Sequence, residues 1–110
     1  MSLQIQLRTT GEVIASGQPN ETVQVFEGNW YFAPEAVNTK YLKISDRIYT
    51  CSYKGQCYWI DLDTPEAHVE NIAWIYWNPK NGYEFIKEQI GFYARNTAAT
   101  VAVNDEPQAA

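Results

Sequence analysis

Apolar and polar residues alternate through most of this chain, and this period of two sets the class of fold. Apolar residues occupy positions 3, 5 and 7, polar residues occupy positions 4, 6 and 8, and the alternation returns at Thr22 to Phe26. A period of two is typical of a strand with one buried face. Turn residues separate the short segments. The pattern predicts a mainly β (α+β) fold with antiparallel strands.

One segment departs from this pattern and has the spacing of a helix. Apolar residues at positions 83, 86 and 90 fall on one helical face. Asn81 can cap the first turn, Glu84 completes a capping-box pair, and Gly91 is placed to end the helix. The sequence therefore predicts one short helix from Asn81 to Ile90. A single helical turn is also expected after Pro34.

The length of 110 residues corresponds to one domain with one hydrophobic core. We expect a single domain over residues 1–110, with its core in residues 3–103. Residues 104–110 are expected to form a frayed tail, because chain ends without apolar periodicity are rarely held in place.

The charge balance excludes several partners. The formal net charge is −5, and the Lys and Arg residues are few and scattered. Nucleic acids and anionic membranes are bound through clustered basic side chains, so we expect neither partner. No apolar run approaches the roughly 20 residues that span a membrane, and the N-terminus lacks the features of a signal peptide. The sequence predicts a cytoplasmic protein whose two cysteines are thiols.

The segment Thr50 to Trp59 (TCSYKGQCYW) is predicted to form a central hairpin. A three-residue loop over residues 53–55 would place Cys51 opposite Cys57, on a face shared with Tyr49 and Trp59. A two-residue loop over residues 54–55 would instead point the two cysteines to opposite faces. We favour the three-residue loop because lysine disfavours a positive φ angle.

Two side chains of this hairpin are candidates for chemistry or ligand contact. Cys51 lies three residues from Lys54, and a nearby cation raises the thiolate fraction of a thiol. Cys51 is therefore the candidate catalytic residue, although a free cysteine is often an inert core residue, and Cys57 fits that structural role better. Lys54 could hold an anionic ligand or could be a solvated turn residue.

Residues that follow the turn could line the same pocket. Trp74 and Tyr76 come from the apolar run Glu70 to Trp77 (ENIAWIYW), and they could equally be core. Asn71 lies inside this run, where a buried amide needs hydrogen-bond partners, so it could fix a ligand or tie a loop to the sheet. The predicted ligand-binding residues are Cys51, Lys54, Tyr58, Asn71, Trp74 and Tyr76.

Motifs for other chemistry are missing from the sequence. With one histidine in the chain, no serine–histidine–acid set stands out, and there is no glycine-rich phosphate loop. A zinc site on the two cysteines would need two further ligands, and His68 alone belongs to the usual set. Asp61 and Asp63 lack the rest of a calcium loop and are expected to be solvated. We therefore expect no metal, no cofactor and no assignable reaction.

These segments resemble the bacterial domain-of-unknown-function family 427. Its members typically show Cys-Pro-aromatic-Lys-Gly, then Tyr-Trp, then Glu-Asn-x-Ala-Trp-x-Tyr and a Gly-x-x-Phe-Tyr stretch; this chain has TCSYKGQCYW, ENIAWIYWNP and IGFY. The resemblance covers about residues 3–103 and implies a fold similar to the β-tent of methionine-sulfoxide reductase B. The family often carries His at the position of Thr50 and Pro at that of Ser52. Because its activity is not established, the resemblance implies a fold rather than a reaction.

Two functions therefore remain open. The first is the binding of a small molecule in an aromatic-lined pocket, which is the usual form of a ligand site. The second is a protein-interaction module that uses a sheet face or edge rich in Trp and Tyr. The sequence names neither the ligand nor the protein partner, and it leaves the oligomeric state open.

Overall fold

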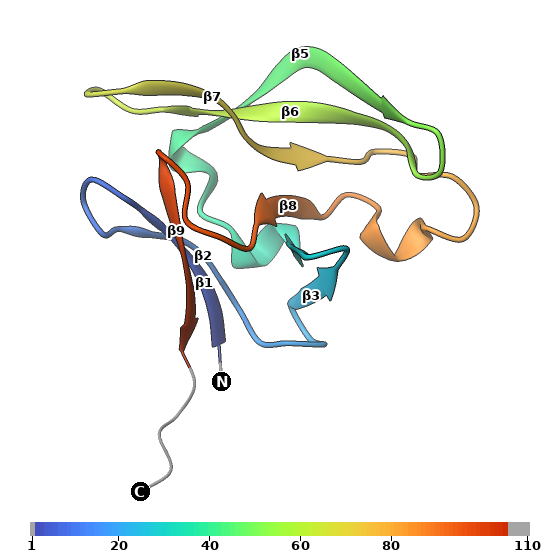
Figure 1. Ribbon diagram of the computed structural model, residues 1–110, viewed down its shortest axis with the longest axis horizontal. Helices are drawn as coiled ribbons and strands as arrows, with labels where there is room; N and C mark the ends of the chain where they lie inside the picture. Colours follow the sequence, from blue (N-terminus) through green and yellow to red (C-terminus); the bar gives the residue numbers. More distant parts are fainter. Residues whose placement is uncertain (1, 106–110) are drawn as a thin grey trace, which may run out of the picture.

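Two antiparallel β-sheets build the fold in the computed structural model, which describes residues 2–105 (Figure 1). The smaller sheet has the strand order β2-β1-β9, and the larger has the order β3-β4-β8-β7-β6-β5. The strands are β1 (Ser2–Leu7), β2 (Val13–Gly17), β3 (Val23–Phe26), β4 (Asn29–Phe32), β5 (Leu42–Cys51), β6 (Gly55–Asp63), β7 (His68–Ile75), β8 (Ile90–Tyr93) and β9 (Thr100–Asp105). The short 3-10 turns are η1 (Pro34–Ala36), η2 (Thr39–Tyr41) and η3 (Glu84–Ile86). The predicted mainly β, single-domain antiparallel class is confirmed.

Alternation gives the larger sheet two different apolar faces. Phe32, Ile60 and Phe92 face the smaller sheet and pack with Ile5 of β1 in the main hydrophobic core. Side chains at the alternate positions, such as Trp74, form a second cluster on the other face. The larger sheet therefore has one face inside the core and one face available for a separate site.

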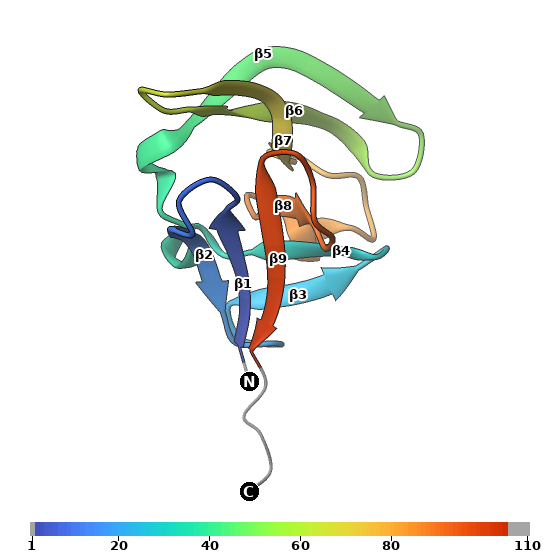
Figure 2. The same cartoon turned by 60° about the vertical axis from the view of Figure 1, so that its left-hand side comes forward.

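The first and last described strands close the smaller sheet. Figure 2 shows β1 and β9 side by side, and Leu3 pairs with Asn104. This pairing continues β9 to Asp105, two residues beyond the predicted end of the core at 103. The rest of the predicted tail, residues 106–110, lies outside the described residues. Within residues 2–105 we find no helix with the length and apolar character required to cross a bilayer.

The helix predicted over Asn81 to Ile90 is wrong, because the chain forms the short turn η3 there. Gly82 and Glu88 have φ angles of 95° and 62°, which an α-helix excludes. The Glu88 N–H donates to the carbonyl of Tyr76 at 2.9 Å, so a contact with a distant segment replaces a helical hydrogen bond. Ile86 is nevertheless fully buried, because this loop folds over the second face of the larger sheet.

The central hairpin turns one residue earlier in the chain than we favoured from the sequence. Its loop is residues 52–54, so Cys51 pairs with Gly55 and Tyr49 pairs with Cys57. Gly55 takes the positive φ angle of 102°, a conformation that glycine adopts without steric cost. The predicted opposition of Cys51 and Cys57 is therefore wrong. The three-residue loop length is confirmed, and with it the shared face of Tyr49 and Cys57.

Two irregularities bend the larger sheet beside Asp61. The register of β5 on β6 shifts between Ile44 and Ile48, and the register of β6 on β7 shifts between Ile60 and Leu62. Bulges of this kind kink a sheet and turn side chains in new directions. Asp61 lies at the second shift and next to the first, and it is 4% exposed, so the expectation that it is solvated is wrong. The reason is that β6 continues to residue 63 and carries Asp61 into the sheet.

Candidate functional site

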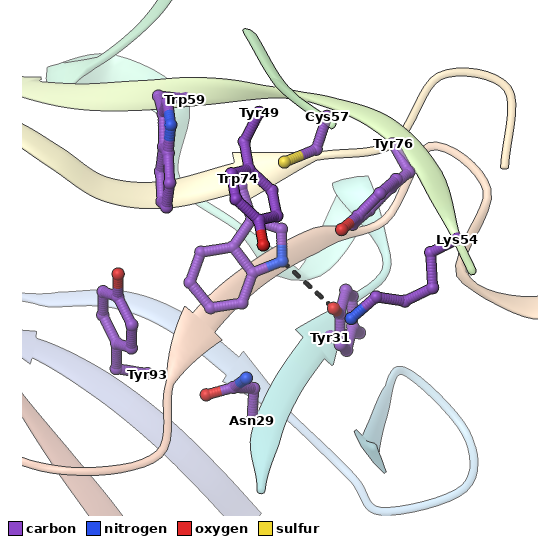
Figure 3. A pocket seen from close by; sticks show the side chains of 9 residues that line it. All are labelled: Asn29, Tyr31, Tyr49, Lys54, Cys57, Trp59, Trp74, Tyr76 and Tyr93. Carbon is purple, nitrogen blue, oxygen red and sulfur yellow. Dashed lines mark hydrogen bonds between the residues drawn. The ribbon is translucent and has the colours of Figure 1, made fainter. Parts of the chain in front are cut away.

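A shallow cavity of about 170 Å³ opens on the second face of the larger sheet (Figure 3). Strand pairing explains how its central side chains meet. Trp59 lies opposite Trp74, Trp74 lies opposite Gly91, and Gly91 lies opposite Tyr31. Because opposite residues on neighbouring strands share a face, these residues form one row across four strands.

Flanking residues on the same face complete the cavity. Tyr49 lies opposite Cys57 on one side of the central row, and Tyr76 follows β7 there. Asn29 lies opposite Tyr93 on the other side. The lining is therefore mostly aromatic, with an amide and a thiol among the rings.

Gly91 makes room for the indole of Trp74, which forms the floor of the cavity. The Trp74 Nε1–H reaches across Gly91 and donates to the Tyr31 hydroxyl at 3.1 Å. A Cβ atom at Gly91 would lie 2.6 Å from Cε2 of the indole. The rings of Trp59 and Tyr93 pack against Trp74 at steep angles, with centroids 6.0 Å and 5.0 Å away. These contacts fix the indole in one position.

Lys54 brings a positive charge to one end of the cavity. Its Nζ pairs with the carboxylate of Glu27 and lies 5.7 Å from the ring centroids of Phe26 and Tyr76. Burial by itself lowers the pKa of Lys54, but the hydrogen bond to Glu27 and the other nearby groups raise the pKa overall. The ammonium group is therefore charged at neutral pH. The Lys54 side chain is 14% exposed, so the groups around it hold the ammonium in place.

A strained turn positions the carboxylate that meets Lys54. Glu27 and Gly28 connect β3 to β4 with φ angles of 54° and 74°. Two successive positive φ angles are typical of a type I′ hairpin turn, in which a residue other than Gly, Asn or Asp is unusual. The turn therefore keeps Glu27 at some conformational cost.

The hydroxyls of Tyr31 and Tyr76 and the thiol of Cys57 are neutral. Burial raises the pKa of the Tyr31 hydroxyl, although the hydrogen bond from Trp74 partly offsets this rise. Burial also raises the pKa of the Cys57 thiol and of the Tyr76 hydroxyl. These groups can donate hydrogen bonds to a ligand, whereas Cys57 is a poor nucleophile because it is held as a thiol.

The structure brings three of the six predicted ligand-binding residues together in this cavity, namely Lys54, Trp74 and Tyr76. Cys51 lies outside the lining. Its Sγ accepts a hydrogen bond from the Lys54 backbone N–H at 3.4 Å, and this bond lowers the pKa of the thiol. Tyr58 lies on the opposite face of β6 and packs against the main core.

Asn71 belongs to a different cluster, at the bend of the sheet. Its side-chain oxygen accepts from Arg47 at 3.0 Å, and its backbone N–H donates to Asp61 at 3.0 Å. Arg47 also pairs with Asp61 and, at 3.1 Å, with Glu70. Asn71 has a φ angle of 61°, so the cluster holds an irregular backbone. In this position Asn71 ties neighbouring strands together, whereas the structural role considered from the sequence was to tie a loop to the sheet.

The same cluster contains a group of potential metal ligands. Ligand atoms of Asp61, His68 and Glu70 lie within 4.8 Å of one another. The guanidinium of Arg47 pairs with both carboxylates and already supplies positive charge there. A divalent cation would have to displace Arg47, so this arrangement fits an ion-pair cluster better than a metal centre.

The predicted ligand-binding set also omitted three lining residues of the central hairpin, Tyr49, Cys57 and Trp59. Sequence reasoning did not consider Asn29, Tyr31 and Tyr93 as lining residues at all. They come from β4 and β8, which are far from the central hairpin in the sequence. One signal was available at Gly91, because a glycine inside an apolar strand often marks the close approach of another group. That signal indicates close packing without naming the residue that fills the space.

The comparisons with known proteins identify a family. The chain is similar to the family described as "Domain of unknown function (DUF427)", whose sequence model matches residues 1–103. No curated protein matches the chain.

Proposed function

This chain belongs to the DUF427 family of unknown function, and we propose that it binds a small molecule in the aromatic cavity of the larger sheet. The proposal rests on one observation: rings from several strands surround a space of about 170 Å³ and do not fill it. Aromatic clusters that serve stability alone pack to the density of a core. A concave apolar wall with a few convergent polar groups is the usual form of a ligand site.

The exposure of the cavity wall supports this function. Tyr49 is 52% exposed and packs beside Trp59, with ring centroids 6.2 Å apart. Trp74 behind them is almost fully buried. A ring that enters between these side chains would cover apolar surface that is now in contact with water, which favours binding.

No reaction accompanies the proposal. The thiol that lines the cavity, Cys57, is neutral, and the more acidic thiol of Cys51 lies outside it. We also propose a cytoplasmic location, which agrees with two free thiols, and no nucleic-acid partner, which follows from a net charge of −5. Micromolar, salt-sensitive retention of duplex DNA or RNA in a mobility assay would contradict the last point.

A fragment screen tests ligand binding. Flat, single-ring compounds are added to the labelled protein, and chemical shifts of backbone and indole N–H groups are followed by NMR. We expect some fragments to shift the Trp59 and Trp74 indole signals. In a Trp59→Leu variant these fragments should bind at least about tenfold more weakly, because one wall of the cavity is removed.

A matched control uses the exposed tryptophan outside this cavity. Trp77 is 39% exposed, and we expect a Trp77→Leu variant to bind the same fragments as the unchanged protein. A screen in which no fragment shifts the cavity signals would contradict the proposal. Equal losses in the Trp59 and Trp77 variants would contradict it too.

The edge strand β5 favours protein interaction as a second function. Ile44, Ile48 and Tyr49 are each exposed on this strand, which lies at the edge of the larger sheet. An edge strand offers unpaired backbone groups to another chain. A charge introduced by Ile48→Lys should weaken such an interaction and leave fragment binding unchanged, because Ile48 points away from the face of Tyr49.

A further inference from the structure

The cavity has two chemically different ends. In Figure 3 the Lys54 ammonium and the Tyr31 hydroxyl lie at one end, and the rings of Trp59 and Tyr93 lie at the other, with the Trp74 indole between them. None of the lining residues described is an Asp or a Glu. The polar end therefore offers a positive charge and hydrogen-bond donors, and the other end offers flat apolar walls.

The donors at the polar end are available to a ligand. The Tyr31 oxygen accepts the hydrogen bond from Trp74, so its own proton can point to another acceptor. The pKa of Tyr31 is raised by burial, so this proton is retained at neutral pH. Lys54 has three donor hydrogens, and its observed ionic partner is the half-exposed carboxylate of Glu27. A ligand acceptor could bind both groups at once.

The size of the cavity limits the apolar part of the ligand. An engineered apolar cavity of about 150 Å³ is large enough to hold a benzene molecule. The present space of about 170 Å³ matches one ring with a small substituent. The steep angles of the Trp59 and Tyr93 rings to Trp74 leave ring faces and edges for stacked or edge-on contact with that ring.

We propose that this cavity takes a small flat ring that carries one carboxylate. The ring lies against Trp59 and Trp74, and the carboxylate binds the Lys54 ammonium and the Tyr31 hydroxyl. Glu27 holds Lys54 in the free protein, and the ligand carboxylate competes with it for the same ammonium. This inference deepens the proposed function and rests on it.

A cationic ligand is the main competing class, because aromatic rings attract cations. Lys54 opposes it: the ammonium lies 5.7 Å from the centroid of Tyr76, a ring that lines the cavity, and would repel a second cation. Charge-assisted hydrogen bonds to an anion, in contrast, are stronger than neutral ones. The charge of the ligand is therefore the feature that the experiment must vary.

Three probes of similar size separate the alternatives: benzoate, benzamide and benzylamine. Each is titrated into the labelled protein at low and at moderate salt, with the indole signals of Trp59 and Trp74 as readout. We expect benzoate to bind about tenfold more tightly than benzamide and to lose affinity as salt is added. Benzylamine should bind most weakly.

Two variants of the ion pair should have opposite effects. Lys54→Met keeps the side-chain length and should weaken benzoate binding by about tenfold and benzamide binding by clearly less, because a neutral acceptor loses a weaker hydrogen bond. Glu27→Gln removes the competing carboxylate and should tighten benzoate binding by about threefold. Lys40→Met is a matched control, because it removes one exposed lysine charge on η2, away from the cavity lining. It should change neither affinity.

The outcomes separate this inference from the function on which it rests. If benzamide binds in the cavity as tightly as benzoate, or benzylamine binds more tightly than both, the carboxylate class is refuted and ligand binding stands. If Glu27→Gln weakens or does not change benzoate binding, the competition is refuted, even where Lys54→Met fails to fold. If no neutral or charged ring shifts the cavity signals, the proposed function itself fails.

Discussion

Replacement of Gly91 by alanine tests whether the missing side chain at this position is what allows the cavity floor to form. The added Cβ would lie 2.6 Å from Cε2 and 3.0 Å from Cζ2 of Trp74, and closer still to Nε1. Contacts this short cannot persist, so the indole or β8 must move. The substitution is otherwise small, and the φ angle of Gly91 is not in the positive region.

The expected cost follows from what holds the indole in place. Trp74 is 6% exposed and has ring neighbours on several sides, so it cannot rotate away freely. Overpacking of a filled site costs about 1–3 kcal/mol. Movement of the indole also breaks the hydrogen bond to Tyr31, which is worth about 1 kcal/mol. We therefore expect Gly91→Ala to lower the free energy of unfolding by about 2–4 kcal/mol, or the melting temperature by about 10–15 °C.

Urea unfolding followed by tryptophan fluorescence measures this change, and a double-mutant cycle identifies its cause. In a Trp74→Leu background the added methyl group meets a smaller side chain. The Gly91→Ala change should then cost less than about 1 kcal/mol, so the coupling energy should be large. A loss below about 0.5 kcal/mol in the original background, or an equal loss in both backgrounds, would refute the steric explanation.

Three further predictions concern other parts of the structure. Asp61→Ala should lower the free energy of unfolding by about 2–4 kcal/mol, because it leaves Arg47 and the Asn71 N–H without a buried partner. Asp63→Ala changes an exposed residue and should cost less than about 0.5 kcal/mol in the same unfolding assay. Iodoacetamide should label Cys51 in the folded protein, and faster at neutral pH than an ordinary thiol, because the hydrogen bond from Lys54 lowers the pKa of Cys51. Cys57 should react only after unfolding. Mass spectrometry that finds Cys57 labelled first would contradict this. Burial raises the pKa of Cys57 above 9.0 and that of Tyr31 above 10.0. The stability that comes from a raised pKa is complete below the pKa of the unfolded state and is lost as the pH rises through the pKa of the folded state. The free energy of unfolding should therefore fall above about pH 9, and it should fall less steeply in Cys57→Ala.

The site could be predicted in part from the sequence. The central hairpin, its three-residue loop length and the shared face of Tyr49 and Trp59 follow from local alternation and turn chemistry. The turn was predicted one residue too late, which shifted the partner of Cys51 by two residues, because glycine serves as the left-handed residue at the start of β6 rather than inside the loop. Cys51 was placed with Cys57 for that reason. By alternation the two thiols still share one face, but the shift places Cys51 opposite Gly55 at the end of the hairpin, outside the cavity lining.

The false helix shows a different limit. Residues 81–90 have helical spacing, but Gly82 and Glu88 adopt positive φ angles and the chain binds back to Tyr76. Helical propensity over ten residues is worth little compared with tertiary packing. Burial of Ile86 on the second face of the sheet is satisfied by a loop as well as by a helix.

The sequence by itself determined the mainly β class, because a period of two repeated through the chain places apolar side chains on one face of each strand, where they can pack into a core. It also determined the acidic balance, a net charge of −5, on which the expectation of no nucleic-acid partner rests. The tertiary structure alone decided that Tyr31 meets Trp74 across Gly91, that Tyr93 packs beside the same indole, and that Glu27 meets Lys54. These residues lie on strands far apart in the sequence, and their pairing depends on sheet order and register. Local periodicity specifies which face a side chain occupies, and it carries no information about which strand lies next to it.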